Sequence, residues 1–394
     1  MLTKTKIDLK SKNQKDQKYE IEMDDFGPEK MIEVYDPAIG MRGFLVIDNT
    51  VLGLGKGGMR MAPNVTKQEV YRLARVMTWK NALAGIDFGG AKSGIIWNGG
   101  TDEEKKAYVQ SFARAIEPFI PKQYIAAPDV GTGEREMQWF VEAINEFDGA
   151  TGKPGTFCKG FYKTKHCGIP HEVGSTGYGV AQSTKAAIEF IGKDIKDITV
   201  AIHGFGNVGS FAFKFLKDMG ARVIAVADVD TAFIDQKGLS SDLFDLTKSN
   251  KSLKEYKGNK IETMKPEDLL LLDVDVLIPA SVTDVINEDN KEGVRAKMIV
   301  EGGNIPMRDN IEEELHEKGV LIIPDFVANS GGVLSSYAEH KGYSIQEMFR
   351  LLDEKMGNNT KKVLKYSVKN DLSPRRAGLK LAKEIIKNNS NNKS

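Results

Sequence analysis

The chain has 394 residues, more than the roughly 250 to 300 that one hydrophobic core usually serves, so its length predicts two domains. Its 55 Lys and Arg residues balance its 55 Asp and Glu residues, and this zero net charge argues against a nucleic acid or an anionic membrane as partner. A function directed at small molecules is therefore expected.

The N-terminal segment MLTKTKIDLKSKNQKDQKYE is rich in lysine but has no arginine and no apolar core, so it matches neither secretory nor mitochondrial targeting sequences. No apolar run approaches the roughly 18 residues that span a bilayer. The two cysteines, Cys158 and Cys167, are too few for a disulfide framework and are consistent with a reducing compartment. Together these features predict a cytoplasmic protein.

The first part of the chain alternates strand and helix patterns. The β-branched sequence at 43–61 predicts a strand that ends in a glycine-rich turn, and the apolar spacing at 67–85 predicts a helix. A buried strand at 87–96 and helices at 102–120 and 135–147 are expected to follow. Residues 149–174 are rich in Gly, Pro and Lys without periodicity, which is typical of a connector. We therefore place a first domain at residues 1–174.

Beyond the connector, the pattern is that of a parallel α/β sheet. A helix at about 175–192 precedes an apolar strand, a helix and a second apolar strand at 221–230, which together form a βαβ unit. Short apolar strands at 275–280, 296–303 and 320–326 continue the alternation. The sequence thus predicts an α/β protein whose residues 175–341 form a Rossmann-like, doubly wound dinucleotide-binding domain. The last helices, expected at about 331–341, 345–357 and 374–387, have no strand partners left, and those within about 342–394 are expected to complete the first domain.

A glycine-rich turn follows the first strand of this unit. Gly204, Gly206 and Gly209 have the G-x-G-x-x-G spacing, and they lie between an apolar strand and a helix. The first glycine permits a tight turn, the second lets a pyrophosphate approach the backbone beside Asn207 and Val208, and the third allows close helix packing. This context predicts a dinucleotide site.

An aspartate at the end of the next apolar strand bears on the choice of cofactor. Asp228 would accept hydrogen bonds from the adenosine ribose 2′-hydroxyl and would repel a 2′-phosphate, so NAD is expected, with NADP as the alternative. A simple turn aspartate is the competing explanation of Asp228, and Asp230 is close enough in sequence to take its role.

Three lysines and one aspartate stand in apolar or glycine-rich sequence, where an unpaired charge is costly: Lys56 in GKGGMR, Lys80 and Lys92 in MTWKNALAGIDFGGAKSGI, and Asp129 in AAPDVGT. Separately, each has an ordinary explanation as a snorkelling surface lysine or a turn aspartate. Together they predict a site that holds a dicarboxylate and moves protons.

These stretches, together with STGYG, HGFGNVG, EGGNIP and PDFVANSGGVLSSY, occur in the order and with the spacing of the glutamate/leucine/phenylalanine/valine dehydrogenase family. The sequence resembles this family from about residue 35 to 385. The resemblance implies an NAD(P)-dependent amino acid dehydrogenase with an N-terminal substrate-binding and oligomerisation domain, and a homohexamer.

The resemblance also implies roles for individual residues. It makes Lys92 the catalytic lysine, Asp129 the acid that exchanges protons with the amino group, and Lys80 the ligand of the substrate α-carboxylate. Three further positions match residues around the nicotinamide and the substrate cleft: Thr176 and Asn304 for the nicotinamide, and Asn329 for the cleft.

In the mechanism of the family, hydride passes from the substrate Cα to nicotinamide, a neutral lysine activates water to attack the resulting iminium, and the carbinolamine collapses to a 2-oxo acid and ammonia. Lys80 must therefore stay charged to bind a carboxylate. Lys92 must instead reach its neutral form, which burial and neighbouring cations favour.

Lys56 and Ser336 occupy the two family positions that touch the substrate side chain. A γ-carboxylate satisfies a buried ammonium and hydroxyl, whereas an aliphatic side chain leaves both unpaired, so glutamate, 2-oxoglutarate and ammonia are the expected substrates. The segment GFLVIDNTVLG is more similar to the leucine-type enzymes, and a leucine or valine dehydrogenase is therefore the alternative. A non-catalytic dinucleotide-binding regulatory protein is more remote, because Lys92 and Asp129 are both present.

The connector brings Cys158, His166, Cys167 and His171 close together in sequence, a mixture that could ligate zinc. Their spacing matches no standard zinc motif, and the neighbouring lysines disfavour a cation. We therefore predict no metal site and a basic surface loop.

Overall fold

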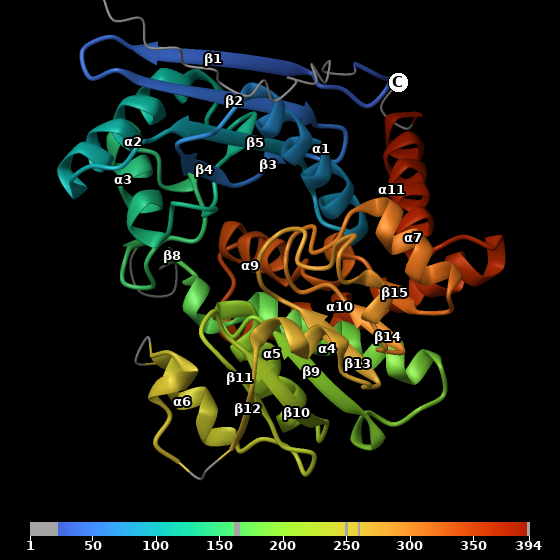
Figure 1. Ribbon diagram of the computed structural model, residues 1–394. Coiled ribbons are helices and arrows are strands. Elements are labelled where there is room, and N and C mark those ends of the chain that lie inside the picture. Colours follow the sequence, from blue (N-terminus) through green and yellow to red (C-terminus); the bar gives the residue numbers. More distant parts are fainter. Residues whose placement is uncertain (1–22, 161–165, 249–250, 259–260, 392–394) are drawn as a thin grey trace, which may run out of the picture.

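The computed structural model describes residues 23–160, 166–248, 251–258 and 261–391. The lysine-rich N-terminal segment at 1–20 lies outside these ranges. Figure 1 shows a six-stranded sheet in the upper half of the molecule and a seven-stranded sheet in the lower half, with helix α9 (Gly331–His340) between them.

The six-stranded sheet has the order β1-β2-β5-β3-β6, with β4 paired to β5. Its strands are β1 (Lys30–Asp36), β2 (Met41–Asn49), β3 (Leu54–Lys56), β4 (Met59–Ala62), β5 (Phe88–Ile96) and β6 (Tyr124–Ile125). The strand predicted at 43–61 is thus divided into three, because Gly53 and Gly57 lie against the backbone of the chain around β5. A Cβ atom would meet the carbonyl oxygen of Asp87 at 2.2 Å from Gly53 and that of Ala91 at 1.7 Å from Gly57.

Helices cover both faces of this sheet: α1 (Lys67–Ala84) on one face, and α2 (Asp102–Ile116) and α3 (Glu134–Ile144) on the other. The alternation along β2 explains the two layers. Leu45 and Ile47 join the core beneath α2 and α3, whereas Phe44 and Val46 pack with α1. These three helices confirm the predicted ones to within a few residues.

The seven-stranded sheet has the order β12-β11-β10-β9-β13-β14-β15, and its last five strands are parallel. The strands are β9 (Thr199–His203), β10 (Arg222–Ala227), β11 (Ala232–Ile234), β12 (Glu262–Met264), β13 (Val276–Pro279), β14 (Met298–Val300) and β15 (Leu321–Ile323). Because β9 pairs with β10 on one side and β13 on the other, the strand order reverses there, as at the ligand-binding edge of doubly wound folds.

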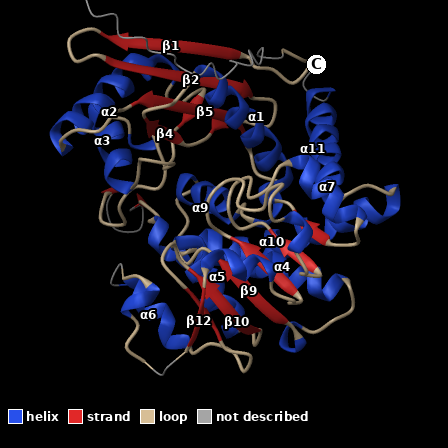
Figure 2. Cartoon of the chain, in the orientation of Figure 1, coloured by secondary structure: helices blue, strands red, loops and turns tan. Residues whose placement is uncertain are grey.

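Helices also cover both faces of the lower sheet, as Figure 2 shows. Val200 and Ile202 pack with α4 (Ser175–Phe190) and α5 (Asn207–Asp218), and Ala201, between them, packs on the side of α7 (Asp309–Glu317). The short helices α6 (Phe244–Lys248) and α8 (Asp325–Ala328) complete this half. The predicted two-domain α/β fold with a doubly wound sheet is confirmed.

Helices α9, α10 (Ile345–Asn370) and α11 (Pro374–Asn391) end the described chain. Helix α10 continues well beyond the predicted end at 357, because Val363 and Leu364 extend its buried face past the polar residues at 358–360. It packs mainly on α4, whereas α11 contacts both α1 and β15. The division of the chain at residue 174 stays a prediction, since α11 ties the two halves together.

The connector differs from the predicted loop. Residues Cys158–Lys159 (β7) and His166–Cys167 (β8) form a short antiparallel pair in which the two cysteines lie directly opposite each other, and their sulfurs form a disulfide. The interpretation of the two cysteines as those of a reducing compartment is thus not supported by the structure, because the strand pairing brings the thiols together. A disulfide sulfur is not a thiolate ligand, so in this structure the pair does not supply a zinc site. None of the described residues form a group of three or more His, Cys, Asp or Glu placed to hold a metal ion.

None of the described helices combines the length and apolar character that crossing a bilayer requires.

Candidate active site

Lys92 and Asp129 are brought together by the upper sheet. Lys92 lies in the middle of β5, between β2 and β4, and Asp129 lies in the segment that follows β6. Gly58 allows the close approach, since a Cβ there would lie 2.8 Å from the Cβ of Asp129. The Lys92 ammonium forms an ion pair with Asp129 Oδ2, and both side chains are about nine-tenths buried. The two predicted catalytic residues thus meet directly.

The surroundings of Asp129 favour its ionised form. Its Oδ1 accepts a hydrogen bond of 2.7 Å from the backbone N–H of Val130 and lies 3.5 Å from an Arg60 guanidinium nitrogen. Burial alone would raise the pKa of Asp129, but the charges of Lys92 and Arg60 outweigh it and hold the pKa below its usual value. Sequence reasoning missed Arg60, although it belongs to the quoted GKGGMR motif.

Lys80 lies in the buried last turns of α1 and reaches across to the other half of the molecule. Its Nζ donates a 2.6 Å hydrogen bond to Asn329 Oδ1, just after α8. Asn329 Nδ2 in turn donates to the carbonyl oxygen of Gly303 at 3.0 Å and to Asn304 Oδ1 at 3.1 Å. Burial lowers the pKa of Lys80, and the nearby Lys92 adds to this effect. Hydrogen bonds therefore connect Lys80, the predicted ligand of the α-carboxylate, through Asn329 to Asn304, the residue predicted to contact the nicotinamide.

Lys56 is fully buried at the end of β3. Its ammonium donates to Ala126 O at 2.5 Å and to Thr151 Oγ1 at 2.7 Å. Burial sets the pKa of Lys56 well below its usual value, with the charges of Lys153 and Lys92 acting in the same direction. The ammonium that the sequence assigned to a γ-carboxylate is thus held by acceptors of the protein itself.

Further charged side chains act on Lys56 from helix α9 and from the connector. Glu339 forms a buried ion pair of 2.6 Å with Lys153, and its negative charge favours the charged form of Lys56. The pKa of His340 is lowered by burial and by the charge of Lys56. Ser336, one turn before His340 on the same helix, is half-buried. The sequence gave no signal for Glu339, because its partners come from distant segments.

Three lysines and one arginine of the candidate site are largely enclosed by the protein. Lys56, Lys80 and Lys92 are 1%, 8% and 7% exposed, and Arg60 is half-buried. Asp129 pairs with Lys92 and Arg60, whereas the ammonium groups of Lys56 and Lys80 donate to neutral groups of the protein. Such a site favours a small anion that brings its own negative charge, which agrees with the predicted dicarboxylate.

The glycine-rich turn between β9 and α5 has the form of a dinucleotide cradle. Gly204 has a φ of 104°, and a Cβ on Gly209 would lie 1.8 Å from the carbonyl oxygen of Gly204. Gly206, by contrast, faces open space, since a Cβ there would meet nothing within 4 Å. Helix α5 begins at Asn207, and Val208 is its second residue. The N–H groups of the first turn have no partner within the helix and lie beside this opening. These residues fit a pyrophosphate.

The start of α4 packs closely against the same glycine-rich turn. A Cβ on Gly177 would lie 2.6 Å from the carbonyl oxygen of Val208, and one on Gly332 would lie 2.9 Å from Thr176 Oγ1. Thr176 is 9% exposed at this junction. The structure therefore groups Thr176 with the glycine-rich turn and with the start of α9, as expected for residues around one cofactor.

Asp228 lies after β10, where the sequence placed it, but its carboxylate is already engaged. Its two oxygens accept four hydrogen bonds of 2.7–2.9 Å, from the backbone N–H groups of Asp230, Thr231 and Leu253 and from the hydroxyl of Ser252. Asp230 is exposed, and one of its oxygens lies 3.5 Å from Lys254 Nζ. The assignment of Asp228 to the ribose stays a prediction, and Asp230 is the freer of the two carboxylates.

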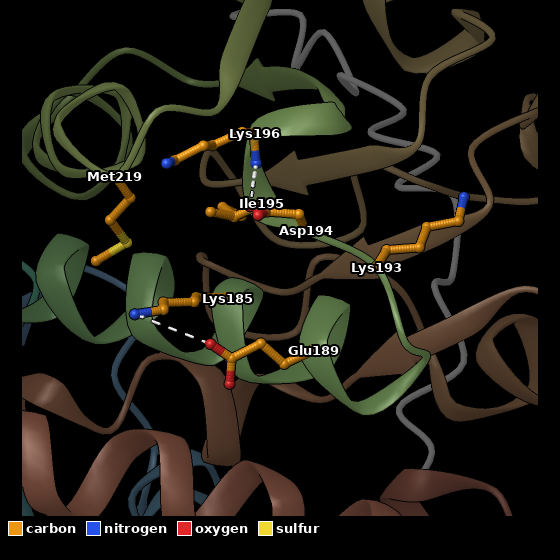
Figure 3. Close-up of a pocket in the computed structure, with 7 residues that line it drawn as sticks. All are labelled: Lys185, Glu189, Lys193, Asp194, Ile195, Lys196 and Met219. Atoms are coloured by element: carbon orange, nitrogen blue, oxygen red, sulfur yellow. Dashed lines mark hydrogen bonds and ion pairs between the residues drawn. The ribbon is translucent and has the colours of Figure 1, made fainter.

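The pocket in Figure 3 lies away from all of these residues. It is a hollow of about 390 Å³, lined by Lys185 and Glu189 of α4, by the turn 193–196 and by Met219. Its lining is largely made of exposed charged side chains, of which Lys185 and Glu189 form an ion pair of 3.9 Å. It contains none of the predicted site residues.

Comparison with known proteins gives matches over both halves of the chain. A family model described as "Glutamate/Leucine/Phenylalanine/Valine dehydrogenase" matches residues 167–392, and one described as "Glu/Leu/Phe/Val dehydrogenase, dimerisation domain" matches residues 28–146. A glutamate dehydrogenase of Aeropyrum pernix is 37% identical over 355 residues, covering 86% of this chain and 82% of that protein.

Two further proteins show the same similarity. An NADP-specific glutamate dehydrogenase of Saccharolobus shibatae is 38% identical over 331 residues, covering 79% of this chain and 75% of that protein. The crystal structure of a glutamate dehydrogenase from Peptoniphilus asaccharolyticus superposes with a TM-score of 0.78 at 26% identity, covering 93% of this chain and 92% of that one.

Proposed function

Because the chain belongs to the glutamate/leucine/phenylalanine/valine dehydrogenase family, we propose that it catalyses the reversible oxidative deamination of L-glutamate to 2-oxoglutarate and ammonia. The family makes it an NAD(P)-dependent amino acid dehydrogenase. The observation that carries the proposal is the group of buried cations at the site: Lys92 and Arg60 pair with Asp129, whereas Lys56 and Lys80 hydrogen-bond to neutral groups of the protein and are left to bind a substrate carboxylate. The names of the relatives from A. pernix and S. shibatae support glutamate as the substrate.

The residues of the chain divide the chemistry among them. Lys80, hydrogen-bonded to Asn329, is placed to hold the α-carboxylate of the amino acid across the two halves. The glycine-rich turn and the start of α5 would hold the dinucleotide, which supplies the hydride acceptor for the substrate Cα. In its neutral form Lys92 serves as base toward water, and Asp129, beside Lys92, takes and returns the proton that moves with the amino group.

Lys56 supports glutamate over an aliphatic substrate. Buried lysines need acceptors, and a γ-carboxylate could replace Ala126 O or Thr151 Oγ1 as a partner of the ammonium. An aliphatic side chain would leave the cluster without that negative charge. The alternative of a leucine or valine dehydrogenase is not favoured by the relatives.

We also propose that the protein works as a cytoplasmic homohexamer. The match of residues 28–146 to a dimerisation domain supports self-association, and the resemblance to the family supports six copies. Light scattering on the purified protein, coupled to size-exclusion chromatography, tests this directly. A monomer at micromolar concentration would contradict it.

The proposed activity is tested by reductive amination with a panel of 2-oxo acids, each with NADH and with NADPH. We expect 2-oxoglutarate to give the highest kcat/KM of the panel. A higher value for the 2-oxo acid of leucine or valine would overturn the substrate assignment. Absence of turnover with every pair would support a non-catalytic binding protein instead.

A further inference from the structure

A buried charge cluster lies where α11 meets the lower half of the molecule. Arg375, the second residue of α11, is 12% exposed in its side chain and contacts three buried carboxylates. One guanidinium NH₂ group lies 2.8 Å from Glu301 Oε2 and 3.2 Å from Asp325 Oδ1, and Nε pairs with Glu312 Oε2. These partners come from the end of β14, from α8 and from α7, so one side chain joins four elements.

The cluster is connected to the candidate active site through α8. Asp325 Oδ2 accepts a 3.1 Å hydrogen bond from the backbone N–H of Ile305, and the Asp325 N–H donates to Glu301 Oε2 at 2.7 Å. One turn later, Asn329 contacts Gly303 and Asn304 and accepts the hydrogen bond of Lys80. Helix α8 thereby fixes both the loop 301–305 and the ammonium of Lys80.

The loop needs this support. Ile305 has a φ of 49°, in the left-handed region that β-branched residues rarely adopt. Such a conformation persists only when the surrounding contacts determine it. The hydrogen bond from the Ile305 N–H to Asp325, whose other oxygen is held by Arg375, is one of those contacts.

We propose that Arg375 is a positioning residue of the active site, which sets the place of Lys80 and of the loop 301–305 through Asp325 and α8. This inference rests on the proposed function, because it takes Lys80 as the ligand of the substrate carboxylate. Arg375 itself touches none of the predicted catalytic residues, and so it acts through others.

The charges of the cluster make the positioning sensitive to pH. Burial raises the pKa of Glu301 well above its usual value and that of Glu312 to about 7, although the charge of Arg375 opposes both shifts. Glu312 faces Arg375 from α11, Asp325 from α8 and Glu301 from the end of β14, with Asp309 on its own helix. One guanidinium thus faces more carboxylates than it can neutralise, and Glu312 changes its charge near neutral pH.

The first test compares Arg375→Lys with Arg376→Lys in the full-length enzyme. Lysine keeps the charge at 375 but cannot contact three carboxylates at once. Arg376 is the matched control, because it joins the same two helices by pairing with Glu313 at 3.1 Å, yet its side chain is 64% exposed. We expect KM for the amino acid to rise at least tenfold in Arg375→Lys and less than twofold in Arg376→Lys. We expect kcat, and the Kd for NAD(P)H measured by fluorescence titration, to change less than threefold.

The second test uses the pH profile and remains decisive if Arg375→Lys does not fold. In the wild type, KM for the amino acid should fall as pH rises through about 7, because ionised Glu312 holds the guanidinium more firmly. Glu312→Gln, fixed in a neutral form, should lose this inflection, whereas Glu313→Gln should keep it. If the cluster only stabilised the fold, Glu312→Gln would not remove the inflection in KM.

The inference would be overturned by equal KM values in Arg375→Lys and Arg376→Lys, or by identical pH profiles in Glu312→Gln and the wild type. A lower kcat in Arg375→Lys with an unchanged KM would also overturn the inference, since it would report only a smaller amount of folded enzyme. Failure of the proposed function is distinguishable, because the wild type would then turn over none of the amino acids used.

Discussion

Lys92 and Asp129 show at the scale of single residues how burial and pairing create a reactive site. Replacing Lys92 with Ala should lower kcat by roughly 100- to 10,000-fold, the usual worth of a general base. The Kd for NAD(P)H should stay within about threefold of wild type, because the dinucleotide turn is formed by other elements. Asp129→Asn should lose the chemical step in the same way, since an amide keeps the shape but relays no proton. Near-normal turnover in either variant would remove the catalytic assignment.

We expect Lys56 and Ser336 to determine the choice of substrate. The double variant Lys56→Met and Ser336→Val should lose most of the kcat/KM for glutamate and gain activity on norvaline, because an aliphatic chain gains about 0.8 kcal/mol per buried CH₂ while a γ-carboxylate loses its ammonium. The measurement is kcat/KM for both amino acids in the wild type, the single variants and the double variant. A double variant that still prefers glutamate would contradict the assignment.

The same substitution has a structural cost that the sequence did not indicate. Lys56→Met removes the donor to Ala126 O and to Thr151, and a buried group left without its partner costs about 1–3 kcal/mol. Kinetics should therefore be compared at a temperature at which circular dichroism shows the variant to be folded.

We expect Asp230 to influence the choice between NAD and NADP, and Asp228 to stabilise the loop that follows β10. Asp230→Ser should raise the ratio of kcat/KM for NADP to that for NAD about fivefold or more, because it removes an exposed negative charge near the expected 2′-phosphate. Asp228→Ser should mainly lower the melting temperature, because two of the hydrogen bonds to Asp228 hold its own turn and two hold the loop at Ser252 and Leu253. If only Asp228→Ser moves the cofactor ratio, Asp228 is the ribose ligand after all.

At the scale of elements, two glycines of the glycine-rich turn are needed for different reasons. Gly209 allows β9 and α5 to pack closely, whereas Gly206 leaves space for a ligand. Gly209→Ala would place a methyl carbon 1.8 Å from the carbonyl oxygen of Gly204, so we expect β9 and α5 to move apart and the melting temperature to fall by several degrees. Gly206→Ala meets nothing within 4 Å and should fold normally, yet it should weaken NAD(P)H binding by about tenfold or more by filling the space left for pyrophosphate.

Fluorescence titration with NAD(P)H and thermal melts, performed on both variants, check this pair. A stable Gly206→Ala that binds NAD(P)H as the wild type does would mean that the pyrophosphate does not approach the backbone at this residue.

At the scale of the whole molecule, one hydrophobic core crosses the division between the two halves. Phe26 and Trp79 pack edge to face with ring centroids 5.1 Å apart, in a core that also includes Leu381 of α11 and Ile323 of β15. Trp79→Ala should destabilise the protein by about 3–5 kcal/mol, as is typical of emptying a buried aromatic site. The matched control is Trp139→Ala, because Trp139 packs only on the core of the upper half.

The shared core also predicts that the halves unfold together. Trp97 and Trp139 pack on the core of the upper half and Trp79 lies in the shared core, so tryptophan fluorescence reports mainly on the upper half, whereas NAD(P)H binding reports on the lower one. We expect the two melting curves to coincide in the wild type. Loss of NAD(P)H binding several degrees below the tryptophan transition would show independent domains.

The sequence by itself determined the elements that depend on local pattern. The apolar spacing of α1, the alternation of the parallel strands and the G-x-G-x-x-G turn arise from neighbouring residues, and all three were found as predicted. The family motifs likewise placed Lys92 and Asp129 in one site, and the family matches confirm the resemblance. Where local pattern was interrupted, as at the glycines after β2 or the polar residues within α10, the predicted bounds were wrong.

The tertiary structure alone decided which partners the polar groups find. Three sets of contacts join segments whose local sequence carries no sign of them: the disulfide of Cys158 and Cys167, the hydrogen bonds from Ser252 and Leu253 to Asp228, and the carboxylates around Arg375. A hydrogen bond or ion pair forms between whichever groups the packed chain leaves within about 3 Å of each other, and its partner is therefore set by topology. Residue type fixes what a side chain can donate, accept or titrate, whereas the fold fixes what it meets.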